Sequence, residues 1–526
     1  MAESSSFDVI IIGGGITGVG TARDCSLRGL KVLLLEKADL TNGASGRNHG
    51  LLHSGARYAV TDMESAAECI RENRIIRQIA SNCVEQTEGL FITLPQDDLQ
   101  YQALFVERCR EAGIDAREID PAMARAMEPS VNPSLIGAVK VPDASVDPFR
   151  LASANALDAV NHGAQIRTYC EVLSLLKDSG VVVGVRYFDR KKKETLCAYA
   201  PVTVNAAGIW GQTIAAMAGC EIKMLPAKGS LLVFGHRVNK MVINRCRKPS
   251  NADILVPGDV VCVIGTTSDK VGLDECDNIK VTPAEVELLL REGCSLAPEL
   301  ENTRILRAYA GVRPLVASDD DPTGRSTSRG IVLLDHETRD GVPGFISITG
   351  GKLTSYRLMA EQTANLVCRK LGVNRKCLTA TEPLPGSEKH SNPNRELSIA
   401  FKAAEGRHGS LIRKMDFSQK SEVLCECEHV TRAEIAYAVK TLGVRNMIDL
   451  RRRTRVGMGT CQGSFCIKKV AEALACELGC PEMEQEFIRE YVQERWKGMT
   501  PVCWGDSLRE AEYMRKQIGR NINDEI

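Results

Sequence analysis

Residues 7–36 read FDVIIIGGGITGVGTARDCSLRGLKVLLLE, and this stretch decides the fold of the first domain. Residues 7–12 form a continuous apolar run with β-branched side chains, which predicts a strand buried on both faces. A helix is expected over residues 16–28, where Gly29 follows in the position typical of a helix end. Residues 31–36 then predict a second buried strand. Together these segments predict a complete βαβ unit.

The glycines between the first strand and the helix have the spacing of a dinucleotide-binding turn. Gly13 permits a tight turn out of the strand, and Gly15 lets the backbone approach a pyrophosphate closely. Gly18 lets the helix pack against the sheet, and the helix N-terminus offers free N–H groups to the phosphates. Glu36 ends the second strand, where a carboxylate can accept hydrogen bonds from a ribose diol. These residues predict a dinucleotide site, and by themselves they leave FAD and NAD(P) both open.

The composition of the whole chain excludes several classes of protein. Its 526 residues, with a mass of 57.4 kDa, are enough for about three domains of roughly 150 residues. The hydrophobic fraction of 44% and the charged fraction of 25% exclude a fibrous or mostly disordered chain. Lys+Arg and Asp+Glu are both 67, a balance that argues against a nucleic-acid partner. The sequence contains no apolar run long enough to span a bilayer and begins with no signal peptide. We therefore expect a cytosolic protein, in which any membrane contact comes through a partner or a surface patch.

The order of strand-like and helical segments indicates how the rest of the chain is organised. Apolar runs typical of strands recur between residues 180 and 348, and amphipathic helices are expected over 62–82 and 151–162. We expect an α/β and α+β fold, in which a Rossmann-type domain carries an inserted mixed or antiparallel substrate domain. Two prolines and a glycine at 382–387, followed by the polar residues 389–396, predict a domain boundary. The expected division is a body over 1–380, a linker over 381–420, a small mainly α module over 421–476 and a helical tail over 477–526.

Three further segments extend the dinucleotide site. Residues 42–50, 204–210 and 348–354 follow one another in this order along the chain. They resemble the flavin contact loop, the returning segment and the last flavin loop of the D-amino-acid-oxidase-like (glycine oxidase) superfamily. This resemblance implies that residues 1–380 form an FAD-dependent oxidoreductase. Besides the motif glycines and Glu36, it adds four expected FAD contacts: Ser45, Gly208, Gly350 and Gly351.

Two other segments point to the substrate. Residues 53–58 (HSGARY) and 311–315 (GVRPL) resemble substrate-site segments of the FAD-dependent glycerol-3-phosphate dehydrogenases, and the terminal cysteines make the anaerobic members the most similar. The resemblance implies oxidation of sn-glycerol 3-phosphate to dihydroxyacetone phosphate, with the C2 hydrogen leaving as a hydride to FAD. Residues 46–50 are closer to the 2-hydroxyglutarate-oxidising relatives, and the cysteine module also resembles that of opine and amine dehydrogenases. A 2-hydroxy acid or an amino acid therefore stays open as the substrate.

Cationic side chains in these segments suit a phosphorylated polyol. A phosphate monoester is dianionic, and binding it requires charge-assisted donors in a fixed geometry. Arg57 and Arg313 are planar bidentate donors, and we predict that they hold the phosphate, with Tyr58 beside them. Lys352 adds a compact positive charge. In a chain with 67 basic residues a single arginine is most often half of a surface ion pair, and this alternative is weaker here because the matched segments converge on the flavin.

His53 is the first candidate for the base that removes the hydroxyl proton, because an imidazole titrates near the operating pH. Lys352 can instead stabilise the developing alkoxide. A structural hydrogen bond to the flavin loop is an equally good interpretation of His53, since buried histidines are usually hydrogen-bonded. His49 is a weaker candidate for the same role.

Four of the twenty cysteines predict a metal centre. Most of the others are single and scattered, and in a reducing compartment such residues behave as small buried hydrophobes. Two close pairs near the C-terminus supply four thiolates, which suit either zinc or an iron–sulfur cluster. Their spacing differs from a zinc ribbon and resembles the bacterioferritin-associated ferredoxin type of [2Fe–2S] domain, whose segment 457–463 is also matched. The expected ligands are Cys425, Cys427, Cys461 and Cys466, whereas Cys476 and Cys480 compete with them from a helix that directs them away.

A flavin beside a one-electron centre needs an acceptor other than oxygen, so we expect electrons to pass to another protein. The resemblance implies a B subunit, which bears a flavin, together with a membrane-bound iron–sulfur C subunit. These partners deliver electrons to quinone, and this chain is attached peripherally to the inner membrane through them. The basic run at 451–455 could offset the charge of the cluster, or it could be a solvated surface. A third interpretation is a non-catalytic protein that binds FAD only, and the arginines and the His53 segment argue against it.

Overall fold

The computed structural model describes residues 5–316, 330–388 and 398–519. The polar stretch 389–396, which the sequence places after the domain boundary, lies outside these residues. At the centre of the N-terminal body is a six-stranded sheet with the order β10-β3-β2-β14-β22-β21, in which β21 alone is antiparallel to its neighbour. The strands are β10 (Gln165–Thr168), β3 (Val32–Glu36), β2 (Val9–Ile12), β14 (Val202–Asn205), β22 (Phe345–Gly350) and β21 (Ile331–Asp335).

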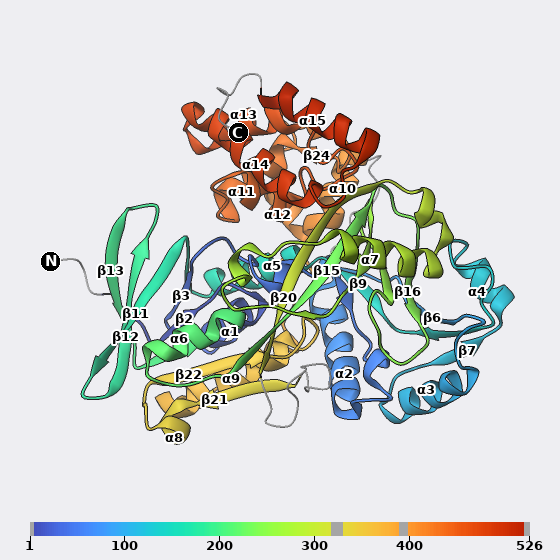
Figure 1. Cartoon of the computed structure of the whole chain (residues 1–526). Coiled ribbons are helices and arrows are strands. Elements are labelled where there is room, and N and C mark those ends of the chain that lie inside the picture. The colour runs from blue at the N-terminus through green and yellow to red at the C-terminus, as the bar shows by residue number, and fades with distance from the viewer. Residues whose placement is uncertain (1–4, 317–329, 389–397, 520–526) are drawn as a thin grey trace.

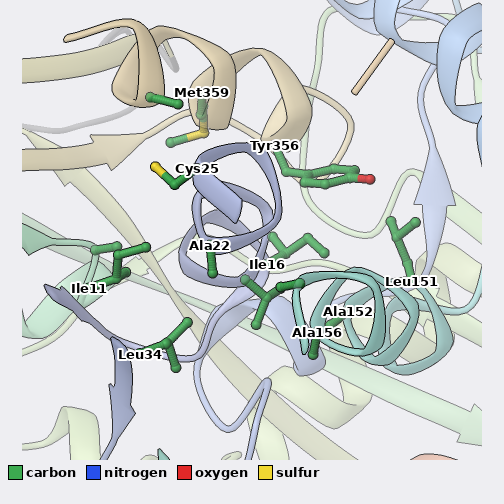
Figure 2. Close-up of a cluster of buried hydrophobic side chains, with 14 of the residues drawn as sticks. Ile11, Ile16, Ala22, Cys25, Leu34, Leu151, Ala152, Ala156, Tyr356 and Met359 are labelled. Carbon is green, nitrogen blue, oxygen red and sulfur yellow. The ribbon is translucent and has the colours of Figure 1, made fainter. Parts of the chain in front are cut away.

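Three helices cover one face of this sheet. They are α1 (Ile16–Leu27), α5 (Pro148–Asn161) and α9 (Tyr356–Leu371), and α1 packs between the other two. Figure 2 shows the resulting cluster, to which α1 contributes Ile16 and Ala22, α5 contributes Leu151 and α9 contributes Tyr356. The opposite face is covered by a four-stranded sheet of β1 (Ser5–Ser6), β13 (Glu194–Tyr199), β12 (Val181–Asp189) and β11 (Cys170–Asp178), together with α6 (Gly211–Met217). Burial on both faces explains why β2 and β3 read as unbroken apolar runs.

The inserted domain is built on a nine-stranded sheet, which confirms the expected mixed or antiparallel layer. Its longest pair is β15 (Met224–Phe234) with β20 (Ile305–Val316), and only β6 and β16 pair in parallel. The other strands are β19 (Asp269–Lys270), β18 (Cys262–Gly265), β17 (Ile254–Pro257), β16 (Val242–Arg245), β6 (Gly89–Thr93), β8 (Gly137–Val141) and β7 (Arg117–Ile119). Around it lie α2 (Met63–Ile79), α3 (Leu99–Glu111), α4 (Pro121–Met127), α7 (Pro283–Leu296), and a small sheet of β4 (Leu51–Leu52), β9 (Ala144–Val146) and β5 (Val84–Glu85).

The C-terminal helices gather at the top of Figure 1, above α5 and the upper ends of β15 and β20. The module contains β23 (Val423–Cys425), β24 (Val430–Thr431), α11 (Arg432–Thr441), α12 (Met447–Thr454), α13 (Ile467–Leu478), α14 (Glu484–Met499) and α15 (Gly505–Gly519). Phe487, Ile488 and Tyr491 of α14 are buried in the same core as the predicted module. The range 381–420, expected to be a linker, contains α10 (Ile399–His408).

The basic run at 451–455 joins the module to the N-terminal body. Arg453 and Arg452 both bind the carboxylate of Asp39, at 2.6 and 3.0 Å. Burial alone would raise the pKa of Asp39, but these two guanidinium groups hold that pKa below its ordinary value. Arg455 contacts Asp147 of the body as well as Glu428 of the module. The interpretation of this run as a solvated surface is therefore wrong, because three of its arginines pair with carboxylates that the sequence pattern could not locate.

Candidate active site and metal centre

The glycine turn after β2 is held by two close backbone approaches. Gly13 has a φ of +113°, and a Cβ on it would lie 2.6 Å from the carbonyl oxygen of Ala206. A Cβ on Gly18 would lie only 1.9 Å from the carbonyl oxygen of Gly13. The turn therefore needs glycine at both positions, and the close packing brings the N-terminus of α1 against the end of the sheet.

Two backbone N–H groups at this turn donate hydrogen bonds to side chains that are expected to contact FAD. Gly15 is the N-cap of α1 and supplies no side-chain cap, while the N–H of Ile16 donates to Ser45 Oγ at 2.9 Å. The carboxylate of Glu36 accepts hydrogen bonds from the N–H groups of Gly14 (2.6 Å) and Ala38 (2.8 Å). Burial raises the pKa of Glu36, and these two hydrogen bonds oppose that rise. A donor-rich helix end next to a fixed acidic acceptor suits a pyrophosphate joined to a ribose.

The remaining expected FAD contacts lie at the same edge of the sheet. The strands β3, β2, β14 and β22 are successive neighbours and run parallel, so their carboxyl ends meet at one edge. Gly208 follows β14, Gly350 ends β22 and Gly351 comes directly after it, with φ values of +58°, +75° and +65°. Four loops thus converge where open α/β sheets bind their ligands. The residues present fit a dinucleotide of the length of FAD.

A substitution in this turn should reveal how tightly it is packed. We expect Gly18→Ala to lower FAD affinity at least tenfold and to destabilise the fold by about 1–3 kcal/mol, because the added methyl group overlaps the backbone of Gly13. FAD content after gel filtration and the melting temperature measure the two effects. Gly406→Ala is the matched control, since apart from its chain neighbours and the backbone of α10 itself no described atom lies within 4 Å of the added Cβ. Full FAD content in Gly18→Ala would contradict this description of the turn.

A cavity of about 170 Å³, here called the substrate cavity, brings together residues from distant segments. It is lined by four of the predicted site residues: His53, Arg57, Tyr58 and Arg313. Arg47, Asn48 and His49 of the expected flavin contact loop also line it. Further polar walls come from residues that no sequence pattern singles out: Ser250, Asn251, Thr266, Thr267 and Ser268. The N–H of His53 donates to Thr354 Oγ1 at 3.2 Å, so this cavity adjoins the last expected flavin loop.

Arg57 is fixed in a way that leaves part of its guanidinium group available to a ligand. Nη2 donates to the carbonyl oxygen of Ser250 at 2.9 Å and to Asp253 Oδ2 at 3.0 Å. Nη1 is buried and has no hydrogen-bond partner among the described residues. A buried N–H donor without an acceptor is costly, which indicates that an acceptor from a ligand completes this group.

Arg313 reaches the same cavity from β20. Its Nη2 donates to the carbonyl oxygen of Thr267 at 3.0 Å and to the hydroxyl of Thr266, and Nη1 lies 3.4 Å from the carbonyl oxygen of Lys228. These contacts orient the guanidinium group within the cavity. Two oriented guanidinium groups on one small cavity suit a dianionic ligand.

His53 and Tyr58 lie side by side in the substrate cavity, with ring centroids 5.5 Å apart. Lys352 stands behind them, because its Nζ is 4.9 Å from the centre of the Tyr58 ring and 3.0 Å from Ser65 Oγ. Lys352 is not among the described residues that line the cavity, whereas His49 is. His49 Nδ1 accepts a hydrogen bond from the N–H of Leu51 at 3.2 Å.

The four predicted cysteine ligands come together in the C-terminal module. The thiol of Cys466 hydrogen-bonds with both Cys425 and Cys461, and Cys461 also contacts Cys427. The hydrogen bond from Cys466 lowers the pKa of Cys461 to about 5, although burial opposes ionisation. Cys476 is exposed on α13 and stands apart from this set.

The spread of the four sulfur atoms fits two iron atoms better than one zinc ion. Around a tetrahedral zinc ion all four sulfur atoms would lie about 3.8 Å from one another. Among the described residues, no three of these sulfur atoms lie within 4.8 Å of one another, although each contacts at least one other. Such an extended set suits a [2Fe–2S] cluster, in which each iron takes its own pair of thiolates.

Comparisons with known proteins support both the FAD site and the cluster site. The FAD dependent oxidoreductase family matches residues 8–357, and the BFD-like [2Fe-2S] binding domain family matches residues 423–475. The chain is 57% identical over 519 residues to the A-type subunit of the anaerobic glycerol-3-phosphate dehydrogenase of Haemophilus influenzae, covering 97% of this chain and 92% of that protein. It is also 57% identical to the corresponding protein of Escherichia coli, covering 98% and 96%, and 42% identical to that of Haloferax volcanii, covering 96% and 88%.

A solved structure extends the comparison of the fold to nearly the whole chain. The glycerol-3-phosphate dehydrogenase of Bacillus halodurans complexed with FAD matches with a TM-score of 0.69 at 23% identity, covering 96% of this chain and 97% of that one. The two family matches and the geometry of the two sites establish FAD and a [2Fe–2S] cluster as the cofactors. The chain belongs to the family of A-type subunits of anaerobic glycerol-3-phosphate dehydrogenases, which are FAD-dependent oxidoreductases that carry a C-terminal [2Fe–2S]-binding domain.

Proposed function

We propose that the chain oxidises sn-glycerol 3-phosphate to dihydroxyacetone phosphate and passes the electrons on through its iron–sulfur cluster. The observation that carries this proposal is the pair of guanidinium groups of Arg57 and Arg313 on one small cavity next to the expected flavin loops. Nη1 of Arg57, which is unpartnered among the described residues, supports an anionic ligand at this place. The names of the relatives supply the substrate that matches this chemistry.

In this proposal, the residues that line the substrate cavity contact different parts of the substrate. Arg57 and Arg313 bind the phosphate, Tyr58 packs against the carbon chain, and His53 accepts the C2 hydroxyl proton at one of its ring nitrogens. Bound FAD supplies the acceptor for the electron pair of the C2–H bond. Lys352, behind Tyr58, adds positive charge that favours the alkoxide formed when the proton leaves.

His53→Ala should slow flavin reduction by glycerol 3-phosphate about 10²-fold or more, which is the size of effect expected when a general base is lost. Stopped-flow flavin absorbance under anaerobic conditions measures this rate. If His53 is the base, the loss should be largest at neutral pH and should shrink at high pH, where hydroxide replaces the base. A rate within a few-fold of the wild-type rate would leave His53 with a structural role only.

We further propose that the chain works in a complex with B-type and C-type subunits that deliver electrons to quinone at the inner membrane. The relatives are named as subunits, which supports a multi-subunit assembly. Within the described ranges, no helix of this chain is both long and apolar enough to cross a membrane. A partner that carries the membrane attachment is consistent with this finding.

A comparison of substrates tests the proposed function. Anaerobic flavin reduction should be fast with glycerol 3-phosphate and at least about 10²-fold less efficient with 2-hydroxyglutarate or amino acids, which lack the phosphate that the two arginines bind. If 2-hydroxyglutarate or an amino acid reduces the flavin faster than glycerol 3-phosphate does, that compound and not glycerol 3-phosphate is the substrate. Reduction by none of these compounds would indicate a protein that binds FAD without oxidising a substrate.

A further inference from the structure

A buried carboxylate, that of Glu285, lies behind the strand that forms one wall of the substrate cavity. Glu285 is the third residue of α7 and is 8% exposed. The helix α7 packs against β15, and β15 in turn pairs with β20, which carries Arg313. Figure 1 shows α7 and β15 next to each other. Glu285 is therefore separated from the substrate cavity by one strand.

The two faces of β15 have different partners, because successive residues of a strand point to opposite faces of its sheet. Gly229 lines the substrate cavity, and a Cβ on it would lie 2.7 Å from Nη2 of Arg313. The guanidinium group of Arg313 thus crosses β15 directly over this glycine. Lys228 and Ser230, on either side of the glycine, both bind Glu285: Lys228 Nζ donates to Oε2 at 2.8 Å and Ser230 Oγ to Oε1 at 2.7 Å.

The same carboxylate also holds Thr267, which lines the substrate cavity. Thr267 comes two residues after β18, the strand that pairs with β15 on the side opposite to β20. Its Oγ1 donates to Oε1 of Glu285 at 3.2 Å and accepts a hydrogen bond from the N–H of Ser230 at 3.0 Å. The hydroxyl group therefore joins this segment to both α7 and β15.

Two of the residues that Glu285 holds also orient Arg313. Nη2 of Arg313 donates to the carbonyl oxygen of Thr267 at 3.0 Å, and Nη1 lies 3.4 Å from the carbonyl oxygen of Lys228. The side chains of Lys228 and Thr267 thus bind one carboxylate while their carbonyl groups contact one guanidinium group. A shift of either backbone segment would turn that group, and bidentate binding of a phosphate depends on its orientation.

The energetics of the Glu285–Lys228 pair indicate a role other than stability. Both residues are buried, at 8% and 7% exposure, and the cost of desolvating two charges largely offsets their attraction. Burial alone would raise the pKa of Glu285, but hydrogen bonds from Lys228, Ser230 and Thr282 lower that pKa to about 2. The carboxylate is therefore ionised at neutral pH and fixed by several donors. Such an arrangement fixes the geometry of the groups around it more than it stabilises the fold.

We propose that Glu285 is a positioning residue for the phosphate site: by joining β15 to the segment after β18, it holds the guanidinium group of Arg313 in the orientation that binds phosphate. This inference rests on the proposed function, in which Arg313 binds the phosphate of glycerol 3-phosphate. Glu285 is not among the described residues that line the substrate cavity, so its effect on the substrate passes through Arg313.

Anaerobic flavin reduction of the full-length, FAD-loaded chain, measured over a range of glycerol 3-phosphate concentrations, tests the proposal. Glu285→Gln keeps the size of the side chain but removes its charge and replaces one acceptor oxygen with an amide nitrogen. We expect the half-saturating concentration to rise at least about tenfold, because a displaced binding group loses much of its effect. The limiting rate should stay within about threefold of the wild-type rate, since the phosphate contact is the same in the ground state and the transition state.

A double-mutant cycle separates positioning from a general loss of structure. In Arg313→Lys the planar fork is already absent, so adding Glu285→Gln should raise the half-saturating concentration by less than about twofold more. If the two substitutions act independently, their effects multiply, and that result would overturn the proposal.

Two further variants control for buried charge and for helix capping. Glu128→Gln makes the same change at a carboxylate that is 1% exposed and accepts from the N–H groups of Lys240 and Met241, none of which lines the substrate cavity. Thr282→Ala removes the side-chain cap of α7 but leaves the contacts of Glu285 with β15. Both variants should lower the melting temperature, and neither should change the half-saturating concentration by more than about twofold.

FAD content and melting temperature verify that each variant is folded. If Glu285→Gln does not retain FAD, Thr267→Val takes its place, because it removes only the hydroxyl group that donates to Glu285, and at least about a threefold rise is expected. The proposal is overturned if the folded variant has the half-saturating concentration of the wild type. A wild-type flavin that glycerol 3-phosphate does not reduce would overturn the proposed function itself, and this inference with it.

Discussion

Arg57→Gln should lower kcat/KM for glycerol 3-phosphate by about 10²- to 10³-fold, the loss expected when one member of a buried, hydrogen-bonded charge pair is removed. Nη1 of Arg57 has no acceptor among the described residues, so the ligand phosphate is its expected partner. The phosphate lies away from the reacting C2 atom, and the interaction is made in the ground state and the transition state alike. The loss should therefore appear mainly as a higher KM, with kcat changed much less.

Two comparisons make this prediction specific to the phosphate. Glycerol, which lacks the phosphate, should be an equally poor substrate for the wild type and for Arg57→Gln. Arg313→Lys should also raise KM for glycerol 3-phosphate, because lysine keeps the charge but loses the planar fork that Thr266 and Thr267 orient. If Arg57→Gln loses activity toward glycerol and glycerol 3-phosphate by the same factor, the arginine does not bind the phosphate.

Cys461→Ala should abolish the visible absorbance of the cluster and nearly all of the bound iron, while the flavin is still reduced by substrate at close to the wild-type rate. Cys461 contacts both Cys427 and Cys466, so its loss breaks the set of four sulfur ligands. The described residues that line the substrate cavity all lie outside the C-terminal module, which explains why flavin reduction should persist. Iron and sulfide analysis with anaerobic flavin reduction measures both effects.

The matched control is Cys476→Ala, which removes an exposed thiol from α13 of the same module. It should keep its iron and its absorbance. Stoichiometric zinc without iron in the wild type, or an intact cluster in Cys461→Ala, would contradict the ligand assignment.

The parts of the fold that the sequence predicts best are those with strong local patterns. The apolar runs of β2 and β3 and the glycine spacing between them specify a parallel sheet with a nucleotide site at its edge, because burial and backbone approach act over a few residues. The close spacing within each cysteine pair indicates a metal site for the same reason.

Features made by contacts between distant segments leave no such pattern. The pairing of Arg452 and Arg453 with Asp39 spans more than 400 residues, and no local pattern near either end of the pair indicates it. The threonines that orient Arg313 reach it only because β15, β18 and β20 are neighbours in one sheet. A cavity of about 1030 Å³ between the module and the body likewise exists only after the module has docked.

If one chain takes an electron pair from glycerol 3-phosphate at its flavin and shares it with its own iron–sulfur cluster, the substrate alone must reduce both centres. The most direct test is an anaerobic titration of the purified chain with glycerol 3-phosphate, followed by flavin absorbance and by electron paramagnetic resonance of the cluster. We expect that the substrate bleaches the flavin and that the signal of a reduced [2Fe–2S] cluster then appears in the same sample. A flavin that glycerol 3-phosphate leaves oxidised would contradict it.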